Sequence, residues 1–235
     1  MSDVVTVETS DGIALVTLDD GKVNVLSHAV LDALDDALTA AENDDAVGAM
    51  VIAGRAGLLS GGFDLKVMMQ GPREAGELVT KGGALFTRIF GSGLPVVAAC
   101  TGHAIAAGAL LMLSCDERVA AQGDFQIGLI ETAKGMVLPR WAVELAEERL
   151  SRRHFQVATV GARMYPPEGA RDAGFADAVV APEAVVDTAI EAAQRWAALP
   201  ATAYAGQVKV NRGERLRRLL AAVDADRGAT FAIDA

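Results

Sequence analysis

Two short glycine-bearing segments are places where the main chain itself can do chemistry. Residues 60–64 read SGGFD and residues 101–109 read TGHAIAAGA, and each lies between an apolar run and a helix-like stretch. N–H groups at the start of a helix have no partner within it and carry partial positive charge, and small residues let an anion come close. Two such turns side by side can therefore donate two hydrogen bonds to one developing oxyanion.

Two other interpretations of these turns stay open. Bound phosphate would use the same N–H donors, but the Lys-Ser/Thr pair of a P-loop is absent from both segments. Small residues also serve the close packing of a helix on a strand, and glycine content alone favours this plainer role.

The remaining polar side chains give no second catalytic pattern. His28, His103 and His154 share no spacing typical of metal ligands. His103 borders the second turn and could contact a ligand there, although a packing role is the better expectation. Ser60 lies outside any G-x-S-x-G motif, so we do not expect a serine nucleophile. Asp64 is placed to cap the helix that follows it.

Composition narrows the function classes. The net charge of −10 argues against nucleic acid as the main partner, and the basic stretch 211–218 is best explained as a solvated helix face. Cys100 and Cys115 show no disulfide or metal spacing, which predicts buried free thiols. The first residues lack the basic and apolar regions of a secretion signal, and no apolar run is long enough to span a membrane. We therefore expect a cytoplasmic protein.

Hydrophobic periodicity predicts an α/β fold. Residues 4–20 alternate across a Ser10-Asp11-Gly12 turn, as in a β-hairpin, and Ser27 is placed to cap a helix. Continuous apolar runs predict buried strands, and helical stripes separate them; the strands are 48–54, 94–100 and 117–123, and the helices are 73–93 and 106–115. This alternation is typical of a parallel sheet with crossover helices. The chain then reads as largely helical from residue 151.

Four motifs in order resemble those of the enoyl-CoA hydratase/isomerase (crotonase) superfamily. LLSGGFDL resembles the family's FSAGADL and FSAGLDL, and CTGHAIAAGALLMLSCDERVAA is similar to VNGxAxGGGxxLxxxCDxRIA. FQIGLIETAKGMVLP is similar to IGLNExxxGxxxP of the Δ3,Δ2-enoyl-CoA isomerase branch, and GARMYPPEGARDAGFADAVVAPEAV to GxxxxAxEAxxxGLVDxVVPxEEL. The likeness runs from residue 5 to about residue 200.

This resemblance implies the crotonase (ClpP/crotonase) spiral, in which repeated ββα units form two roughly perpendicular sheets. The core with the active site would span 1–180. The helical region 181–235 would build a homotrimer or a dimer of trimers.

The resemblance also assigns a role to the two glycine turns. In the family, two main-chain N–H groups polarise the thioester carbonyl of acyl-CoA, and by position they belong to Phe63 and Ala107. Ala107 departs from the usual glycine, but its N–H is retained.

The carboxylates decide the expected reaction. Hydratases of the superfamily hold a water between two glutamates; here the first position is Leu110, and the second is Glu131, four residues before Gly135. One carboxylate suits a 1,3-proton shift, in which Glu131 takes a proton from C2 of a 3-enoyl-CoA and returns it at C4. Apolar neighbours would raise the pKa of Glu131 toward the working pH. Ile130 replaces the usual asparagine. Without the resemblance, Glu131 would be read as an exposed loop carboxylate or a helix N-terminal charge.

The resemblance further implies a set of residues that contact substrate. They lie in the loop around residue 22, at the two turns and beside the glutamate: Lys22, Val23, Val25, Gly61, Asp64, Leu65, Lys66, His103, Ile105, Ala106, Ile130 and Gly135. A coenzyme A thioester would be the substrate, with no permanently bound cofactor and no metal.

Three other functions stay open. The first is an enoyl-CoA hydratase of fatty acid β-oxidation that recruits its second group from elsewhere. The second is a catalytically silent acyl-CoA-binding or assembly protein, which Leu110, Ala107 and Ile130 would favour. The third is another chemistry of the superfamily, such as thioester hydrolysis or dehalogenation, for which no nucleophilic aspartate is visible at a family position.

Overall fold

The N-terminal hairpin is present as predicted. The computed structural model describes residues 4–229, and in it β1 (Val5–Ser10) pairs antiparallel with β2 (Ile13–Leu18). Asp11 and Gly12 join the strands with φ values of 50° and 77°. Such a two-residue turn with positive φ matches the twist of the strands, and aspartate and glycine are residues that adopt it readily.

A six-stranded sheet forms the centre of the molecule, in the order β1-β2-β4-β7-β9-β11. Every pair beyond the hairpin is parallel; the added strands are β4 (Ala49–Gly54), β7 (Val96–Cys100), β9 (Glu117–Ala121) and β11 (Ala178–Val180). All residues of β4 and β7 are buried, as expected for strands covered on both faces.

Short strands beside the main sheet correct the interpretation from periodicity. That interpretation treated residues 60–64 as a turn between a strand and a helix. Instead β5 (Gly57–Ser60), β8 (Gly102–Ile105) and β10 (Ile127–Gly128) form a second, parallel sheet, and β3 (Val25–Leu26) pairs with β6 (Gly62–Phe63). The ββα pattern that the resemblance implied is therefore present.

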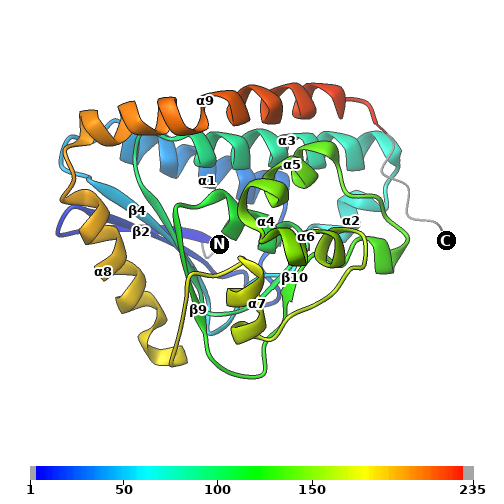
Figure 1. Ribbon diagram of the computed structural model, residues 1–235, viewed down its shortest axis with the longest axis horizontal. Helices are drawn as coiled ribbons and strands as arrows, with labels where there is room; N and C mark the ends of the chain where they lie inside the picture. Colours follow the sequence, from blue (N-terminus) through cyan, green and yellow to red (C-terminus); the bar gives the residue numbers. More distant parts are fainter. Residues whose placement is uncertain (1–3, 230–235) are drawn as a thin grey trace.

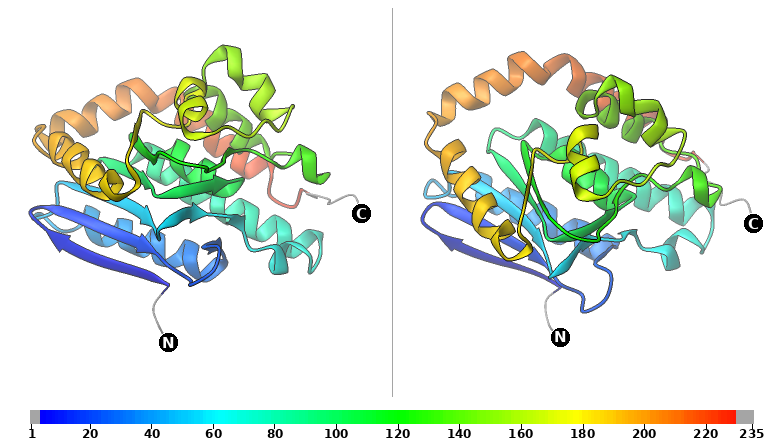
Figure 2. Two further views of the ribbon diagram at one scale, coloured as in Figure 1. Left: turned by 90° about the horizontal axis from the view of Figure 1, so that it is seen from below. Right: turned by 60° about the horizontal axis from the view of Figure 1, so that its bottom comes forward.

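Helices surround these sheets. Their bounds are α1 His28–Glu42, α2 Leu65–Met68, α3 Pro72–Gly91, α4 Ala107–Ser114, α5 Arg140–Arg149, α6 Arg152–Thr159, α7 Pro167–Ala173, α8 Val185–Ala197 and α9 Ala201–Ala225, with 3₁₀ turns η1 Thr132–Lys134 and η2 Pro182–Ala184. The predicted cap is present, because the Val30 N–H donates to Ser27 Oγ at 3.3 Å. Helix α9 runs along α3 (Figure 1), and α8 packs across β4, β7 and β9 (Figure 2). Within residues 4–229, none of the helices combines the length and apolarity needed to cross a membrane.

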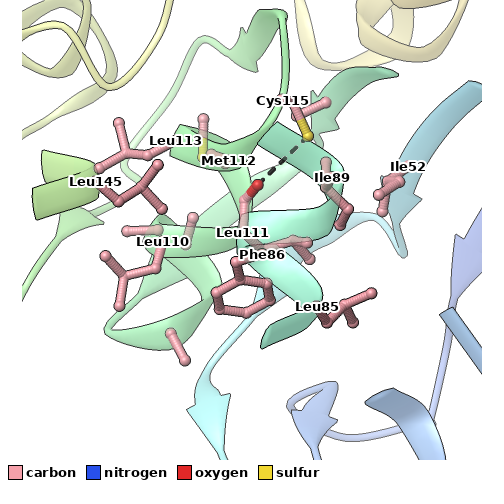
Figure 3. Packing of buried hydrophobic residues seen from close by; sticks show 14 of the residues in the cluster. Ile52, Leu85, Phe86, Ile89, Leu110, Leu111, Met112, Leu113, Cys115 and Leu145 are labelled. Carbon is pink, nitrogen blue, oxygen red and sulfur yellow. Dashed lines mark hydrogen bonds between the residues drawn. The ribbon is translucent and has the colours of Figure 1, made fainter. Parts of the chain in front are cut away.

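The larger apolar core lies between the main sheet and helices α1, α3, α4 and α5. Figure 3 shows Phe86 of α3, Leu110 of α4 and Leu145 of α5 within it, all nearly inaccessible to solvent. A second cluster covers the opposite face of the sheet, where Val185 and Ala189 of α8 join β-strand side chains. The role of 181–235 in assembly stays a prediction, and both predicted domains, 1–180 and 181–235, extend beyond the described residues.

The basic stretch 211–218 differs in part from the expected solvated face. Arg212 is only 13% exposed and pairs with Asp116, whereas Arg215 and Arg218 pair with Glu148 of α5. These three arginines therefore join α9 to the rest of the chain.

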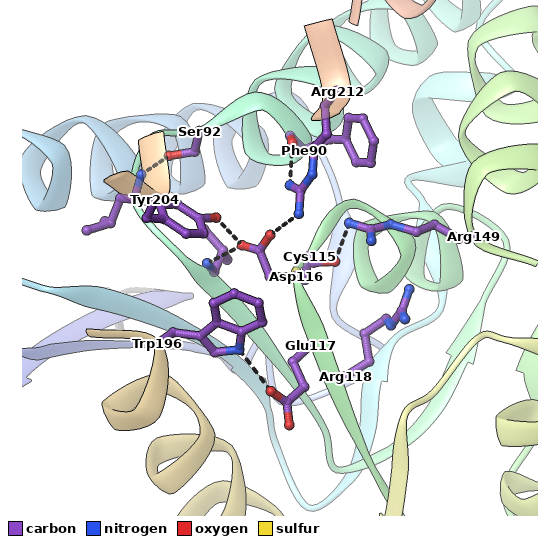
Figure 4. Close-up of polar contacts among 12 residues, drawn as sticks. Phe90, Ser92, Cys115, Asp116, Glu117, Arg118, Arg149, Trp196, Tyr204 and Arg212 are labelled. Atoms are coloured by element: carbon purple, nitrogen blue, oxygen red, sulfur yellow. Dashed lines mark hydrogen bonds and ion pairs between the residues drawn. The ribbon is translucent and has the colours of Figure 1, made fainter. Parts of the chain in front are cut away.

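Asp116 is the centre of the buried polar network in Figure 4. Its side chain is 2% exposed and accepts hydrogen bonds from the Val96 N–H at 2.8 Å and the Tyr204 hydroxyl at 3.0 Å, besides the ion pair with Arg212. These contacts join the start of β9 to β7 and α9. Since the pair is buried and hydrogen-bonded, removing one partner leaves an uncompensated charge.

Replacing Asp116 with alanine should therefore destabilise the fold strongly. We expect Asp116→Ala to lower the free energy of unfolding by about 3–5 kcal/mol, measured by urea denaturation. Asp224→Ala is the matched control, because Asp224 and Arg227 form a pair with side chains 71% and 68% exposed. That change should cost at most about 1 kcal/mol. Equal losses in the two variants would contradict a structural role for the Asp116 network.

Candidate active site

The two glycine-bearing turns meet in space. A Cβ added to Gly62 would lie 3.1 Å from the Ala106 Cβ and 3.4 Å from the Ala107 nitrogen. A Cβ on Gly108 would lie 2.4 Å from the Ser60 carbonyl oxygen, closer than real contacts allow. Gly62 also has a φ of 101°, which residues with a side chain rarely adopt. Glycine at these two positions therefore allows β6 and the start of α4 to approach each other.

Neither expected N–H donor is used by its own element, as the strand pairing shows for Phe63 and the helix start shows for Ala107. The Asp64 N–H donates to the Leu26 carbonyl at 3.4 Å, so the preceding amide, that of Phe63, faces away from β3. Ala107 is the first residue of α4, and the helix itself offers no acceptor for its N–H.

Hydrogen bonds hold the first turn in place. The Ser60 hydroxyl donates to the Asn24 carbonyl at 2.7 Å and accepts from the Gly62 N–H at 3.1 Å. The Gly61 N–H donates to the Val23 carbonyl at 2.8 Å. Thus Ser60 supports the turn through its hydroxyl group, and Val23 does so through its main chain.

Ala106 carries backbone strain immediately before Ala107. Its φ of 54° and ψ of −122° are typical of glycine and costly for alanine. Its N–H donates to the Gly128 carbonyl at 2.9 Å, which anchors the turn to β10. This conformation starts α4 beside Gly62 and thereby orients the Ala107 N–H.

A cavity of about 400 Å³ opens beside these turns, with walls from β6, α2, α3, α4 and the segment after β10. Seven residues of the predicted site line it: Gly61, Phe63, Leu65, Ile105, Ala106, Ile130 and Glu131. Leu110, which occupies the position of the missing carboxylate, lines it too. Sequence reasoning missed seven further lining residues: Met68, Met69, Val79, Lys134, Met136, Val137 and Pro139. Their spacing differs in no way from that of ordinary core or loop residues, so no local signal marked them.

Other predicted contact residues lie outside this lining. Asp64 caps α2, since its side chain accepts from the Lys66 N–H at 2.9 Å. His103 Nδ1 accepts from the Gln126 N–H at 3.0 Å, and its ring packs edge-on against Phe125 with centroids 5.4 Å apart. These contacts favour the packing role expected for His103.

The remaining predicted residues are not among those that line the cavity. Ala107 is buried, and Gly135 ends η1 with a φ of 71°. The side chains of Lys22 and Lys66 are exposed, and Val25 is half-buried in β3. Contact of these residues with a ligand stays a prediction.

Glu131 is the acidic group of the cavity. It lies between β10 and η1, and among the described residues that line the cavity it is the sole carboxylate. Burial raises the pKa of Glu131 to about 7, although nearby main-chain N–H groups oppose the rise. Its Oε2 atom is buried and has no hydrogen-bond partner within residues 4–229. A carboxyl group in this state can accept a proton near neutral pH and hold it without a large penalty.

The cysteines take no part in this cavity. Cys100 and Cys115 are free and buried, as predicted, and burial raises the pKa of both thiols to about 12. Within residues 4–229, no group of three or more His, Cys, Asp and Glu side chains is arranged to hold a metal ion.

Comparison with known proteins identifies the family. A family model described as enoyl-CoA hydratase/isomerase matches residues 8–231. Human mitochondrial enoyl-CoA delta isomerase 1 is 32% identical over 218 residues, which cover 92% of this chain and 72% of the human protein. The chain therefore belongs to the enoyl-CoA hydratase/isomerase family of acyl-CoA enzymes in fatty acid metabolism, which confirms the predicted resemblance.

Solved structures show the same fold. An enoyl-CoA hydratase/isomerase family protein from Pseudomonas syringae is 39% identical with a TM-score of 0.94, covering 98% of this chain and 99% of the other. The apo enoyl-CoA isomerase of Mycobacterium tuberculosis is 41% identical with a TM-score of 0.92, covering 97% and 100%. The fold is thus the crotonase fold, as the resemblance implied.

Glu131→Gln should stabilise the protein at alkaline pH and not at acidic pH. The folded-state pKa is about 7, above the ordinary value of 4.5, so from pH 4.5 to 7 the unfolded chain loses its proton before the folded chain does. Stability of the wild type therefore falls through that window, whereas glutamine carries no such cost. We expect the Tm of Glu131→Gln to exceed that of the wild type at about pH 8.5 and to equal it at about pH 4.

Glu147→Gln is the control for this experiment, because Glu147 is an exposed residue of α5. Its Tm should follow that of the wild type at each pH. A Tm difference between Glu131→Gln and the wild type that does not vary with pH would show that ionisation of the buried carboxyl group does not destabilise the folded state.

Proposed function

We propose that this protein is an enoyl-CoA isomerase, which converts a 3-enoyl-CoA into a 2-enoyl-CoA. The observation that carries the proposal is the pairing of Glu131 with Leu110 in one cavity. Hydration of a 2-enoyl thioester needs a water held and deprotonated, for which hydratases of the family use two glutamates. Leucine can neither accept nor deliver a proton, so this cavity favours a reaction that needs a single base.

The main chain would stabilise the intermediate. The N–H groups of Phe63 and Ala107 would donate to the thioester oxygen, where negative charge develops as the proton leaves C2. A donor of this kind typically contributes about 3–4 kcal/mol to the transition state. Because the donor is main chain, a phenylalanine can occupy the first position.

Glu131 would carry the proton. As a carboxylate it takes a proton from C2, and the C–H electron pair spreads over the dienolate to the thioester oxygen. The neutral carboxylic acid then gives the proton to C4, the double bond moves between C2 and C3, and the carboxylate returns. A pKa of about 7 suits both halves of this exchange, since the group is neither too weak a base nor too weak an acid.

The substrate would be held mostly by apolar and main-chain contacts. The acyl group would occupy the cavity, and the loop around Lys22 and the start of α2 with Lys66 would lie nearer the coenzyme A moiety. Lysine can attract phosphate as a point charge. A coenzyme A thioester would thus be substrate rather than a resident cofactor. The cytoplasmic location stays a prediction.

Glu131→Gln should abolish most of the isomerase activity. We expect wild-type protein to convert a 3-enoyl-CoA into its 2-enoyl isomer, with kcat lowered by about 10²–10⁴-fold in Glu131→Gln and unchanged in Glu147→Gln. The base must be ionised in the free enzyme, so kcat/KM should fall about tenfold for each pH unit below the pKa of about 7. Isomer formation is followed by absorbance of the conjugated thioester or by chromatography.

Two outcomes would replace this proposal by its rivals. Rapid hydration of a 2-enoyl-CoA, undiminished in Glu131→Gln, would indicate a hydratase that uses other groups. Calorimetric binding of acyl-CoA without turnover of either substrate would indicate a binding or assembly protein.

The protein should assemble as a homotrimer or a dimer of trimers. The resemblance supports this proposal, and so do two apolar side chains of α9, since Val210 is 82% and Leu220 is 54% exposed. Sedimentation equilibrium should give a mass about three or six times the chain mass of 24.3 kDa. A mass near that of one chain at all concentrations would contradict the assembly.

A further inference from the structure

Phe63 lines the active-site cavity, and its ring is held from behind. It stacks on Phe86 with ring centroids 6.4 Å apart and an interplanar angle of 9°. Phe86 has no exposed surface and packs in turn edge-on against Trp141, with centroids 5.7 Å apart. The Phe63 ring therefore has no room to retreat in that direction.

Gly82 of α3 provides the space for the edge of this ring. A Cβ added at residue 82 would lie 2.4 Å from Cζ and 2.5 Å from Cε1 of Phe63. Carbon atoms normally approach to about 3.5–4.0 Å, so any side chain at this position must displace the ring by about 1 Å. Because Phe86 blocks one side, the ring would move into the cavity.

The rest of the cavity suits a long apolar group. Its floor includes the buried side chains of Met68, Val79 and Leu110. Its rim carries apolar side chains that are largely exposed, with Met69 76% and Val137 74% accessible. Methionine side chains are flexible and adapt their shape to a ligand. An acyl chain longer than the cavity can therefore continue along an apolar rim.

From these contacts we infer that Gly82 is a positioning residue that sets the depth of the acyl site through Phe63, and that the enzyme thereby prefers long 3-enoyl groups to short ones. This inference rests on the proposed function. Each methylene that is buried contributes about fourfold to kcat/KM or to affinity, by conversion of the transfer free energy of a methylene group.

Substrates of different length separate this role from an effect on the oxyanion donors. Phe63 supplies both the wall and a main-chain N–H, so a displaced residue could also weaken the hydrogen bond to the carbonyl. Every acyl-CoA has the same thioester carbonyl, so a weaker donor slows all substrates equally. A ring that is displaced into the cavity shortens the space for the acyl chain, which slows the long substrates selectively.

The test compares kcat/KM for a six-carbon and a twelve-carbon 3-enoyl-CoA. Wild-type protein should prefer the twelve-carbon substrate. Gly82→Ala should lower kcat/KM for that substrate by about fourfold, because a ring shift of about 1 Å excludes about one methylene, with little change for the six-carbon substrate. Adding Phe63→Leu to Gly82→Ala should restore the long-to-short ratio, because the smaller side chain no longer meets the new methyl group.

Gly91→Ala, in the same helix α3, is the matched control. A Cβ there would lie 2.7 Å from Leu216 Cδ2, a contact nearly as close as that at Gly82, but Leu216 belongs to α9 and does not line the cavity. The two variants therefore share the replacement of a helical glycine and the cost of repacking. Gly91→Ala should leave the long-to-short ratio unchanged, whatever it does to stability.

Several results would overturn the inference. They are a preference of the wild type for the short substrate, an equal loss on both lengths in Gly82→Ala, and the same change of ratio in Gly91→Ala. If the wild type isomerises neither substrate, the proposed function fails, and the inference is then judged by calorimetry. Affinities for saturated six-carbon and twelve-carbon acyl-CoA must show the same ratios in the same variants.

Discussion

The site depends on the close approach of two pieces of main chain that are distant in the sequence. Strand β6 and the first turn of α4 come together because Gly62 and Gly108 present no side chain at the contact, where a methyl group would meet backbone atoms. Ser60 and the strained Ala106 then fix the direction of each segment. In the proposed mechanism the fold contributes positioned dipoles, and side chains enter mainly as walls and as a single base. Because the proposed donors are main-chain N–H groups, residues with different side chains, such as Phe63 and Ala107, can occupy the two donor positions.

Two features of the site are energetically unfavourable, and the surrounding structure must offset their cost. Glu131 is held in an apolar cavity, where one of its oxygen atoms has no hydrogen-bond partner among residues 4–229, and its ionised form is disfavoured there. Ala106 adds backbone strain. Both features persist because they rest on a rigid frame, in which α3 and α4 pack in the main core and the Asp116 network joins β7, β9 and α9. The proposed proton transfer uses the destabilised state of Glu131, since a carboxylate that gains little from solvent takes up a proton more readily.

Features with a local cause could be predicted from the sequence. The hairpin followed from alternation around Asp11-Gly12, the start of α1 from Ser27, and the buried strands β4 and β7 from continuous apolar runs. Strands of two to four residues, such as β6 and β5, are too short to show a period and were visible only through the resemblance. Other features arise from contacts between distant segments and had no local signal. They include the cavity walls at Val79 and Met136 and the contact of the Phe63 ring with Gly82. The basic stretch of α9 was misjudged at Arg212 because its partner, Asp116, lies 96 residues away.

The central claim is that two main-chain N–H groups polarise one thioester carbonyl beside a lone carboxylate. Isotope-edited infrared difference spectroscopy of a bound 2-enoyl-CoA, labelled at the thioester carbonyl, measures this directly. The carbonyl stretch should move to lower wavenumber on binding and should stay there in Glu131→Gln, because the donors are backbone amides. A carbonyl frequency equal to that of the free thioester would show that these amides do not act on the substrate.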